Sequence, residues 1–193
     1  MKNKIKEHSI LFNDQMVRAI LEGRKTQTRR IIKGVDGKNW LKGASNHVVH
    51  AANKCPYGQP GDRLWVRETW AESGLDRIEY RAFPADGKHF RVVGQWRPSI
   101  HMPRKYSRIL LEVTDVKVER IQDIKGEETY REGILPPYVD EKNPRGRFKC
   151  KPHLWHSVDE FKKLWESSYS GSWNRNDWVW VITFKQQKEK CNG

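Results

Sequence analysis

The hydrophobic pattern at the N-terminal end predicts a strand followed by a helix. Residues 9–12 form a short apolar run, and the apolar residues of 14–22 then recur at helical spacing. Asn13 or Asp14 can cap this helix through its side chain. Gly23 can end it, because glycine tolerates the left-handed conformation that commonly follows a helix.

The middle of the chain alternates between strand-like runs and segments rich in turn residues. β-Branched and aromatic residues predict strands at 29–32, 64–70, 78–82, 90–93 and 109–118. The runs 78–82 and 90–93 flank a turn-rich linker, so we expect them to pair as a hairpin. In 109–118 the apolar positions shift from odd to even after Val113, which predicts a bulge or bend in a strand that curls around a small barrel.

The C-terminal half is predicted to contain two helices and a closing strand. Asp123 can cap a helix that runs to about Arg131 and ends at Gly133. Ser157 and Glu160 have the spacing of a capping box, which predicts a second helix from Ser157. The nearly continuous apolar run 178–184 indicates a strand that is central or covered on both faces.

These elements indicate one mixed α/β domain over 1–193, a β-rich α+β fold. The expected architecture is a small twisted barrel with helices packed on its ends. Segments rich in polar, glycine and proline residues predict loop insertions at about 33–61, 72–97 and 135–158 and a polar tail at 186–193.

Charge narrows the class of partner. The chain has 37 Lys and Arg residues against 24 Asp and Glu residues, a formal net charge of +13, which favours a polyanionic partner such as nucleic acid. No apolar run is long enough for a membrane span, and the N-terminal residues lack the pattern of a signal peptide, so we expect a cytoplasmic protein without a membrane partner. Three widely spaced cysteines do not suggest a disulfide framework.

The segment 23–30 is the densest concentration of candidate chemistry. It holds four basic residues (Arg24, Lys25, Arg29 and Arg30) beside two threonines and a glutamine. Arginine grips phosphate through two donors, while a desolvated lysine in its neutral form can take the proton of a hydroxyl such as that of Thr28. The alternative at this point is a solvated basic turn.

Three further sets of residues are candidates for acid–base chemistry, for ligand contacts or for metal binding. The carboxylates of Glu68, Glu112 and Glu132 are candidates for acid–base work, although spacing alone does not choose among them. The stiff segment 96–104 offers Ser99, His101 and Arg104 for polar contacts in a pocket. The metal-ligand types fall into two groups in loops whose spacing matches no common zinc pattern, so neither metal nor cofactor is expected: His47, His50 and Cys55, and Cys150, His153 and His156.

At the Gly-Arg-Lys-Thr-x-Thr-x-Arg segment the chain resembles the ASCH domain family, a branch of the PUA-like superfamily of small β-barrels associated with RNA and modified nucleosides. The order of the expected elements is similar to that of the family from end to end. Segments 55–58, 64–68 and 98–104 look like a phage or prophage branch. One bacterial member of the family is an amidohydrolase that removes acyl groups from N4-acylated cytidine with a lysine, a threonine and a glutamate.

The resemblance implies roles for three residues and leaves alternatives open. Lys25 and Thr28 resemble the lysine and threonine of that enzyme, and Glu132 before Gly133 resembles its glutamate. Thr28 would attack the amide carbonyl, Lys25 would activate it, and Glu132 would pass a proton to the leaving amine. The insertions in this chain are absent from the compact enzyme and suggest a larger ligand or an altered pocket.

Ligand contacts are expected from seven further residues: Arg24, Arg29, Arg30, Glu68, Ser99, His101 and Arg104. The partner is then RNA, DNA or a nucleoside. One alternative is a non-catalytic RNA- or DNA-binding module in which the arginines hold phosphates. Another is a metal-independent ribonuclease that uses Lys25, His101 or tyrosines.

Overall fold

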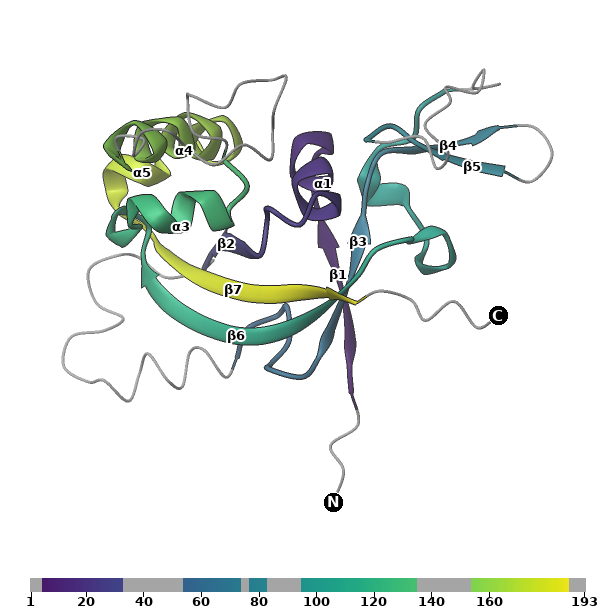
Figure 1. Cartoon of the computed structure of the whole chain (residues 1–193), viewed down its shortest axis with the longest axis horizontal. Helices are drawn as coiled ribbons and strands as arrows, with labels where there is room; N and C mark the ends of the chain where they lie inside the picture. Colours follow the sequence, from purple (N-terminus) through teal and green to yellow (C-terminus); the bar gives the residue numbers. More distant parts are fainter. Residues whose placement is uncertain (1–4, 33–53, 74–76, 83–94, 135–153, 188–193) are drawn as a thin grey trace. The chain divides into compact units, whose positions relative to one another are not determined.

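A computed structural model of the chain describes residues 5–32, 54–73, 77–82, 95–134 and 154–187. The chain divides into two compact units, which are described separately. Unit 1 comprises residues 1–23, 55–115 and 184–193, and unit 2 comprises residues 24–54 and 116–183. Two long bent strands, β6 (Leu110–Arg120) and β7 (Trp178–Gln187), contribute residues to both units (Figure 1).

Unit 1 is built on a small sheet with one helix. Its elements are β1 (Glu7–Leu11), α1 (Asp14–Leu21), β3 (Arg63–Arg67), β4 (Trp70–Ser73), β5 (Arg77–Tyr80), the 3-10 helices η1 (Ser99–His101) and η2 (Arg104–Tyr106), and the start of β6. Strand β1 runs parallel to β3, and β3 is antiparallel to β6. The buried apolar side chains of these strands and of α1 form its interior: Ile10, Val17, Ile20, Leu64, Val66, Leu111 and Val113.

The predicted N-terminal strand and helix are confirmed, with their caps. The Asn13 side chain accepts a hydrogen bond of 2.9 Å from the Met16 backbone N–H, which satisfies one of the free donors of the first turn of α1. Gly23 follows the helix with φ of 74° and donates its N–H to the Ile20 carbonyl. A left-handed residue at this position turns the chain away from the helix axis.

The strand predicted at 78–82 is present as β5, while its predicted pairing with 90–93 lies outside the described residues. Strand β5 pairs with β4, with Trp70 opposite Tyr80 and Ser73 opposite Arg77, so the hairpin is formed with the preceding strand. The closeness of β4 and β5 in sequence keeps the loop-closure entropy of this hairpin small, since only residues 74–76 separate them. The other predicted strand, 90–93, lies outside the described residues.

The predicted bend in the long strand is confirmed. In β6 the buried positions are Leu111 and Val113 and then Val118, so the inward-facing residues change from odd to even along the strand. The change of phase lets one strand bury apolar side chains in each unit. It accompanies the marked curvature of β6 in Figure 1.

The described part of unit 2 combines β2 and parts of two longer strands with three α-helices and one 3-10 helix. Its elements are β2 (Gln27–Ile31), the end of β6, the 3-10 helix η3 (Ile121–Asp123), α3 (Gly126–Arg131), α4 (Leu154–Ser168), α5 (Ser172–Arg175) and most of β7. Strand β2 is antiparallel to β7, with Thr28 opposite Ile182 and Arg29 opposite Val181. The closing strand β7 has neighbours on both sides, as the apolar run predicted.

Both predicted helix starts in this unit are wrong. Asp123 ends η3, and α3 begins three residues later at Gly126, where a glycine costs little because it lies at the helix end. Helix α4 begins at Leu154, so Ser157 lies inside it and is not a cap. The Ser157 hydroxyl donates 3.3 Å to the Gly126 carbonyl, which ties α4 to the first residue of α3.

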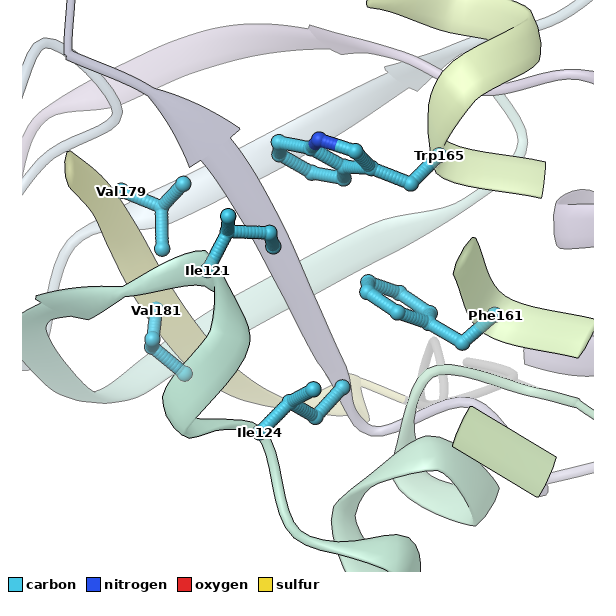
Figure 2. Packing of buried hydrophobic residues seen from close by; sticks show 6 residues of the cluster. All are labelled: Ile121, Ile124, Phe161, Trp165, Val179 and Val181. Carbon is cyan, nitrogen blue, oxygen red and sulfur yellow. The ribbon is translucent and has the colours of Figure 1, made fainter. Parts of the chain in front are cut away.

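An apolar core holds unit 2 together. Figure 2 shows Phe161 and Trp165 of α4 facing Ile121 and the β7 residues Val179 and Val181. All five side chains are at most 5% exposed, and the Phe161 and Trp165 rings stack with centroids 5.9 Å apart. Burying two aromatic side chains contributes about 3–6 kcal/mol before the entropic cost of ordering them.

The hydrogen-bonded order of the five main strands is β1-β3-β6-β7-β2, and β4 and β5 form a separate pair. The few helices accompany a core rich in strands, so the mixed α/β class is confirmed. Among the described residues, no helix is both long and apolar enough to cross a membrane.

Candidate functional site

The candidate site of unit 2 lies where the chain enters β2 and leaves α3. The Thr26 N–H donates 2.9 Å to the Arg131 carbonyl, which fixes the Lys25 segment against the end of this helix. Gly133, with φ of 89°, turns the chain immediately after Glu132. Two segments more than a hundred residues apart in sequence are thereby joined.

Lys25 and Glu132 form a buried ion pair. The Lys25 ammonium donates 2.9 Å to the Glu132 carboxylate at Oε2, and it donates at the same distance to the backbone carbonyls of Glu132 and Gln27. The Lys25 side chain is 0% exposed and that of Glu132 is 4% exposed. The two residues predicted as base and proton relay are therefore in direct contact.

Burial lowers the pKa of Lys25, because the charged ammonium loses its hydration. The Glu132 carboxylate opposes this shift, while the charges of Arg30 and Arg29 add to it. A lysine with a lowered pKa gives up its proton more readily than an exposed one. The Lys25 amine is thus suited to accept a proton during a reaction.

Three carboxylates surround the Arg29 guanidinium. Its guanidinium, whose side chain is 0% exposed, donates to Glu132 at 2.9 Å, to Glu128 at 2.9 Å and to Glu119 at 2.6 and 2.9 Å. Burial opposes the charge on Arg29, but the carboxylates, Glu132 first, outweigh it and raise the pKa of this residue. Arg29 thus lies in the interior of unit 2 among carboxylates rather than at its surface.

Glu119 and Glu128 are members of the site that sequence reasoning missed. Glu119 comes from the end of β6, and Glu128 comes from the first turn of α3, where it also accepts from the Lys125 N–H at 3.1 Å. Burial raises the pKa of Glu119 despite the nearby Arg29 guanidinium. The sequence signal for these two carboxylates was indirect: the basic residues of segment 23–30 would need carboxylate partners if they were buried.

Thr28 belongs to the same strand as Arg29 but faces the other way. Alternation along β2 places Thr28 beside its partner Ile182 on one face, and Arg29 beside Val181 on the opposite face. Thr28 is 2% exposed. The Lys25 ammonium reaches the carbonyl of Gln27, which is the peptide group that carries Thr28.

The remaining basic residues of the segment have different surroundings. Arg24 is partly buried and donates 2.8 Å to the Gly133 carbonyl, so it helps to hold the turn after Glu132. Arg30 is partly buried on the Thr28 face of β2. The expected solvated basic turn is therefore not what the structure shows, because most of this segment is buried in a network of ion pairs and backbone contacts.

Glu68 lies in unit 1 and is fully buried. Its carboxylate accepts two hydrogen bonds from Arg108, at 3.0 and 2.9 Å. Burial raises the pKa of Glu68, and the Arg108 guanidinium works against this shift. The two-point contact gives Glu68 a partner within its own unit.

The other predicted ligand contacts in unit 1 lie at its surface. Ser99 and His101 form the first and last residues of η1, and His101 is exposed. Arg104 begins η2 and donates 2.9 Å to the Glu7 carboxylate. Arg104 remains 44% exposed, so its charge is available at the surface.

The metal hypothesis falls largely outside the described residues, since four of the six candidates do: His47, His50, Cys150 and His153. Cys55 is a buried free thiol. Across the described ranges, no group of three or more His, Cys, Asp or Glu residues has the arrangement of a metal site.

Comparisons with known proteins add one similarity. No protein-family model matches the chain, and no curated protein matches it. A crystal structure of the ASCH domain from Lactobacillus crispatus is similar to it over 94% of this chain and 79% of that chain, with 12% sequence identity and a TM-score of 0.42. A similarity of this degree does not by itself assign a function.

Proposed function

We propose that this chain is an ASCH domain with a small PUA-like barrel, which binds a modified nucleoside and hydrolyses the N4-acyl amide of acylated cytidine. The observation that carries the proposal is the buried contact of 2.9 Å between Lys25 and Glu132, beside the peptide that leads to Thr28. These are the three residue types that the family enzyme uses, at the positions that match its motif.

The first step needs a neutral amine beside a hydroxyl. A proton shift from the Lys25 ammonium to the Glu132 carboxylate yields an amine and a carboxylic acid across a single hydrogen bond. The lowered pKa of Lys25, caused mainly by burial, favours this shift. The amine then takes the Thr28 proton as the Thr28 oxygen attacks the acyl carbonyl.

The second step releases cytidine. The carbon–nitrogen bond of the amide breaks, protonated Glu132 donates its proton to the departing amine, and the acyl group remains on Thr28 as an ester. Water then hydrolyses the ester and releases a carboxylic acid. Lys25 ends as the ammonium and Glu132 as the carboxylate, so the initial ion pair is restored.

Arg29 supports both steps without contacting the substrate. By donating to Oε1 of Glu132, it leaves Oε2 facing the Lys25 ammonium. Its further contacts with Glu119 and Glu128 hold the guanidinium in place. Fixing a carboxylate by a second hydrogen bond is a common way to orient a proton-transfer group.

The test is the release of cytidine from N4-acetylcytidine by the purified chain. Thr28→Val removes the hydroxyl at constant shape, and we expect it to lower the rate at least about a thousandfold, as loss of a nucleophile does. Thr26→Val, at the half-buried neighbouring threonine, is the matched control and should retain the rate. An acetyl group on Thr28, detected by mass spectrometry after rapid quenching, would support the ester intermediate.

Two results would overturn the proposal. One is absence of cytidine release by a folded wild-type chain. The other is equal release by Thr28→Val and wild type. In either case the Lys25–Glu132–Arg29 network would be a structural ion-pair cluster of unit 2.

A further inference from the structure

A second surface with binding chemistry lies on the sheet of unit 1. Along β3 the side chains alternate, so Arg63, Trp65 and Arg67 share the face opposite the buried Leu64 and Val66. All three outward residues are only partly buried. A tryptophan between two arginines therefore lines the outer face of this strand.

The neighbouring strand widens the same face. In the parallel register of β1 with β3, Ser9 lies beside Trp65 and Leu11 beside Arg67, and both are exposed. Ile100 of η1 is 58% exposed and Leu11 is 40% exposed, which makes them two of the few large apolar side chains at the described surface. An exposed apolar rim around an aromatic ring is typical of a contact surface.

Two guanidinium groups are held against the Trp65 ring. The Arg67 guanidinium lies 5.4 Å from the ring centroid, and that of Arg104 lies 6.0 Å from it. Arg67 also donates to the Ile100 carbonyl, and Arg104 donates to Glu7. These contacts pre-orient flat groups on which a nucleobase can stack.

The charge of this face is positive. Arg63 and Arg104 share the single carboxylate of Glu7, at 3.9 and 2.9 Å, while Arg67 contacts a neutral carbonyl. Glu112 of β6 lies directly opposite Arg63, so the two share this face, and Glu112 is also paired with Lys185 at 3.1 Å. The four basic residues Arg63, Arg67, Arg104 and Lys185 outnumber the two carboxylates of Glu7 and Glu112, which leaves an excess of positive charge around the ring.

We propose that this Trp65 surface, comprising Ser9, Leu11, Arg63, Trp65, Arg67, Ile100 and Arg104, binds single-stranded RNA. Unpaired bases stack on the indole and guanidinium planes, while the arginine charges meet the phosphates. Paired bases in a duplex do not expose the faces that this arrangement uses. The exposed Ser9 hydroxyl beside Trp65 offers a partner for a ribose 2′-hydroxyl, which favours RNA over DNA.

The experiment is a titration of the full chain into a labelled oligouridylate of about ten nucleotides, followed by fluorescence anisotropy. Trp65→Ala should weaken binding about 5- to 150-fold, the range found on removal of a stacking aromatic. Trp96→Ala is the control, because Trp96 is an exposed tryptophan of unit 1 that does not belong to the Trp65 surface, and it should bind as wild type. Circular dichroism melts of both variants verify that they are folded.

The charge contribution is tested separately from the ring. In Arg67→Gln/Arg104→Gln, the slope of log affinity against log salt should fall by about 1.4, which is about 0.7 for each lost phosphate contact to a single strand. Arg175→Gln alters an exposed arginine of unit 2 and should leave the slope unchanged. These surface variants keep the proposal testable even if Trp65→Ala does not fold.

The proposal is independent of the proposed hydrolysis. Trp65→Ala should release cytidine from the free nucleoside at the wild-type rate, while Thr28→Val should bind the oligouridylate as wild type does. Equal RNA affinity of Trp65→Ala and wild type, or an unchanged salt slope in the double arginine variant, would overturn the Trp65 surface. Equal affinity for the matching oligodeoxyuridylate would overturn its assignment to RNA.

Discussion

Glu132 holds two buried cations at once, so its removal should cost a large part of the stability of unit 2. In Glu132→Gln the side chain keeps its shape but loses its charge, and both the Lys25 ammonium and the Arg29 guanidinium lose a partner at 2.9 Å. Since the three side chains are at most 4% exposed, water does not replace the lost contact. Breaking a buried pair on one side typically costs about 3–5 kcal/mol.

The Glu132→Gln substitution affects the two cations unequally. Arg29 retains Glu119 and Glu128, whereas Lys25 keeps only the carbonyls of Gln27 and Glu132 among the contacts described for its ammonium. We expect the free energy of unfolding to fall by about 3 kcal/mol, near the lower end of that range. Arg29 keeps two carboxylates, and Lys25 can lose its proton and become neutral. Lys25→Met/Glu132→Gln should be more stable than the sum of the single effects by about 1–3 kcal/mol.

The same variant should change the pH dependence of stability. In the wild type, the folded pKa of Lys25 is lowered from 10.5, so the unfolded chain binds more protons between the two pKa values and stability rises with pH in that window. Without the Glu132 charge the pKa of Lys25 falls further, so the window extends to lower pH. Urea denaturation at several pH values measures both effects.

A cost below about 0.5 kcal/mol for Glu132→Gln, as at an ordinary surface site, would refute this account. So would a double variant whose effect equals the sum of the two single effects, because that would show that Lys25 and Glu132 do not interact. Glu160→Gln, which alters an exposed carboxylate paired with Lys163 on α4, is the control and should change stability little.

Three other outcomes follow from the structure. Burial raises the pKa of the Cys55 thiol to about 11, so alkylation at about pH 8, followed by peptide mass mapping, should label it slowly in the folded chain and quickly after denaturation; equal rates would contradict its burial. Phe161→Ala should cost about 3–5 kcal/mol in chemical denaturation, and a cost below about 1 kcal/mol would contradict the packing of α4 against β7. Gly23→Ala has open space for its methyl group but requires φ of 74°, so it should cost about 1–2 kcal/mol, and a neutral result would contradict the left-handed turn after α1.

Elements specified by local sequence were predicted well. Helix α1 has its cap, its apolar stripe and its terminating glycine within residues 13–23, so each signal supports the others. Strand β7 was predicted as central because its apolar run leaves no polar face for solvent. The bend of β6 was visible in the changed phase of its apolar residues.

Features that depend on the rest of the fold were not predictable in the same way. The Ser-x-x-Glu spacing at Ser157 occurs inside helices as well as at their starts, and in the structure Ser157 lies inside α4 and its hydroxyl donates to the Gly126 carbonyl. The hairpin of β4 with β5 was not predicted either, because the run 64–70 was predicted as one strand, whereas β3 ends at Arg67 and β4 begins at Trp70. Both features depend on tertiary contacts that a local pattern leaves open.

In the candidate site, too, residues within a recognised motif were predicted, and residues supplied by other elements of the fold were not. The resemblance to the ASCH family predicts that Lys25 and Glu132 act together, and in the structure they lie 2.9 Å apart. Glu119 and Glu128 had no local motif, because a carboxylate that neutralises a buried arginine can come from any element that packs against it. Arg29 was predicted to contact the ligand, because its own segment gives no sign of burial. Its carboxylate partners Glu119 and Glu128 come from β6 and α3.

The most direct test of the proposed function is the time course of cytidine release from N4-acetylcytidine by wild type, Thr28→Val and Thr26→Val. The account predicts release by wild type and Thr26→Val and a loss of at least about a thousandfold in Thr28→Val. Equal release by all three chains, or release by none of them while they are folded, would contradict it.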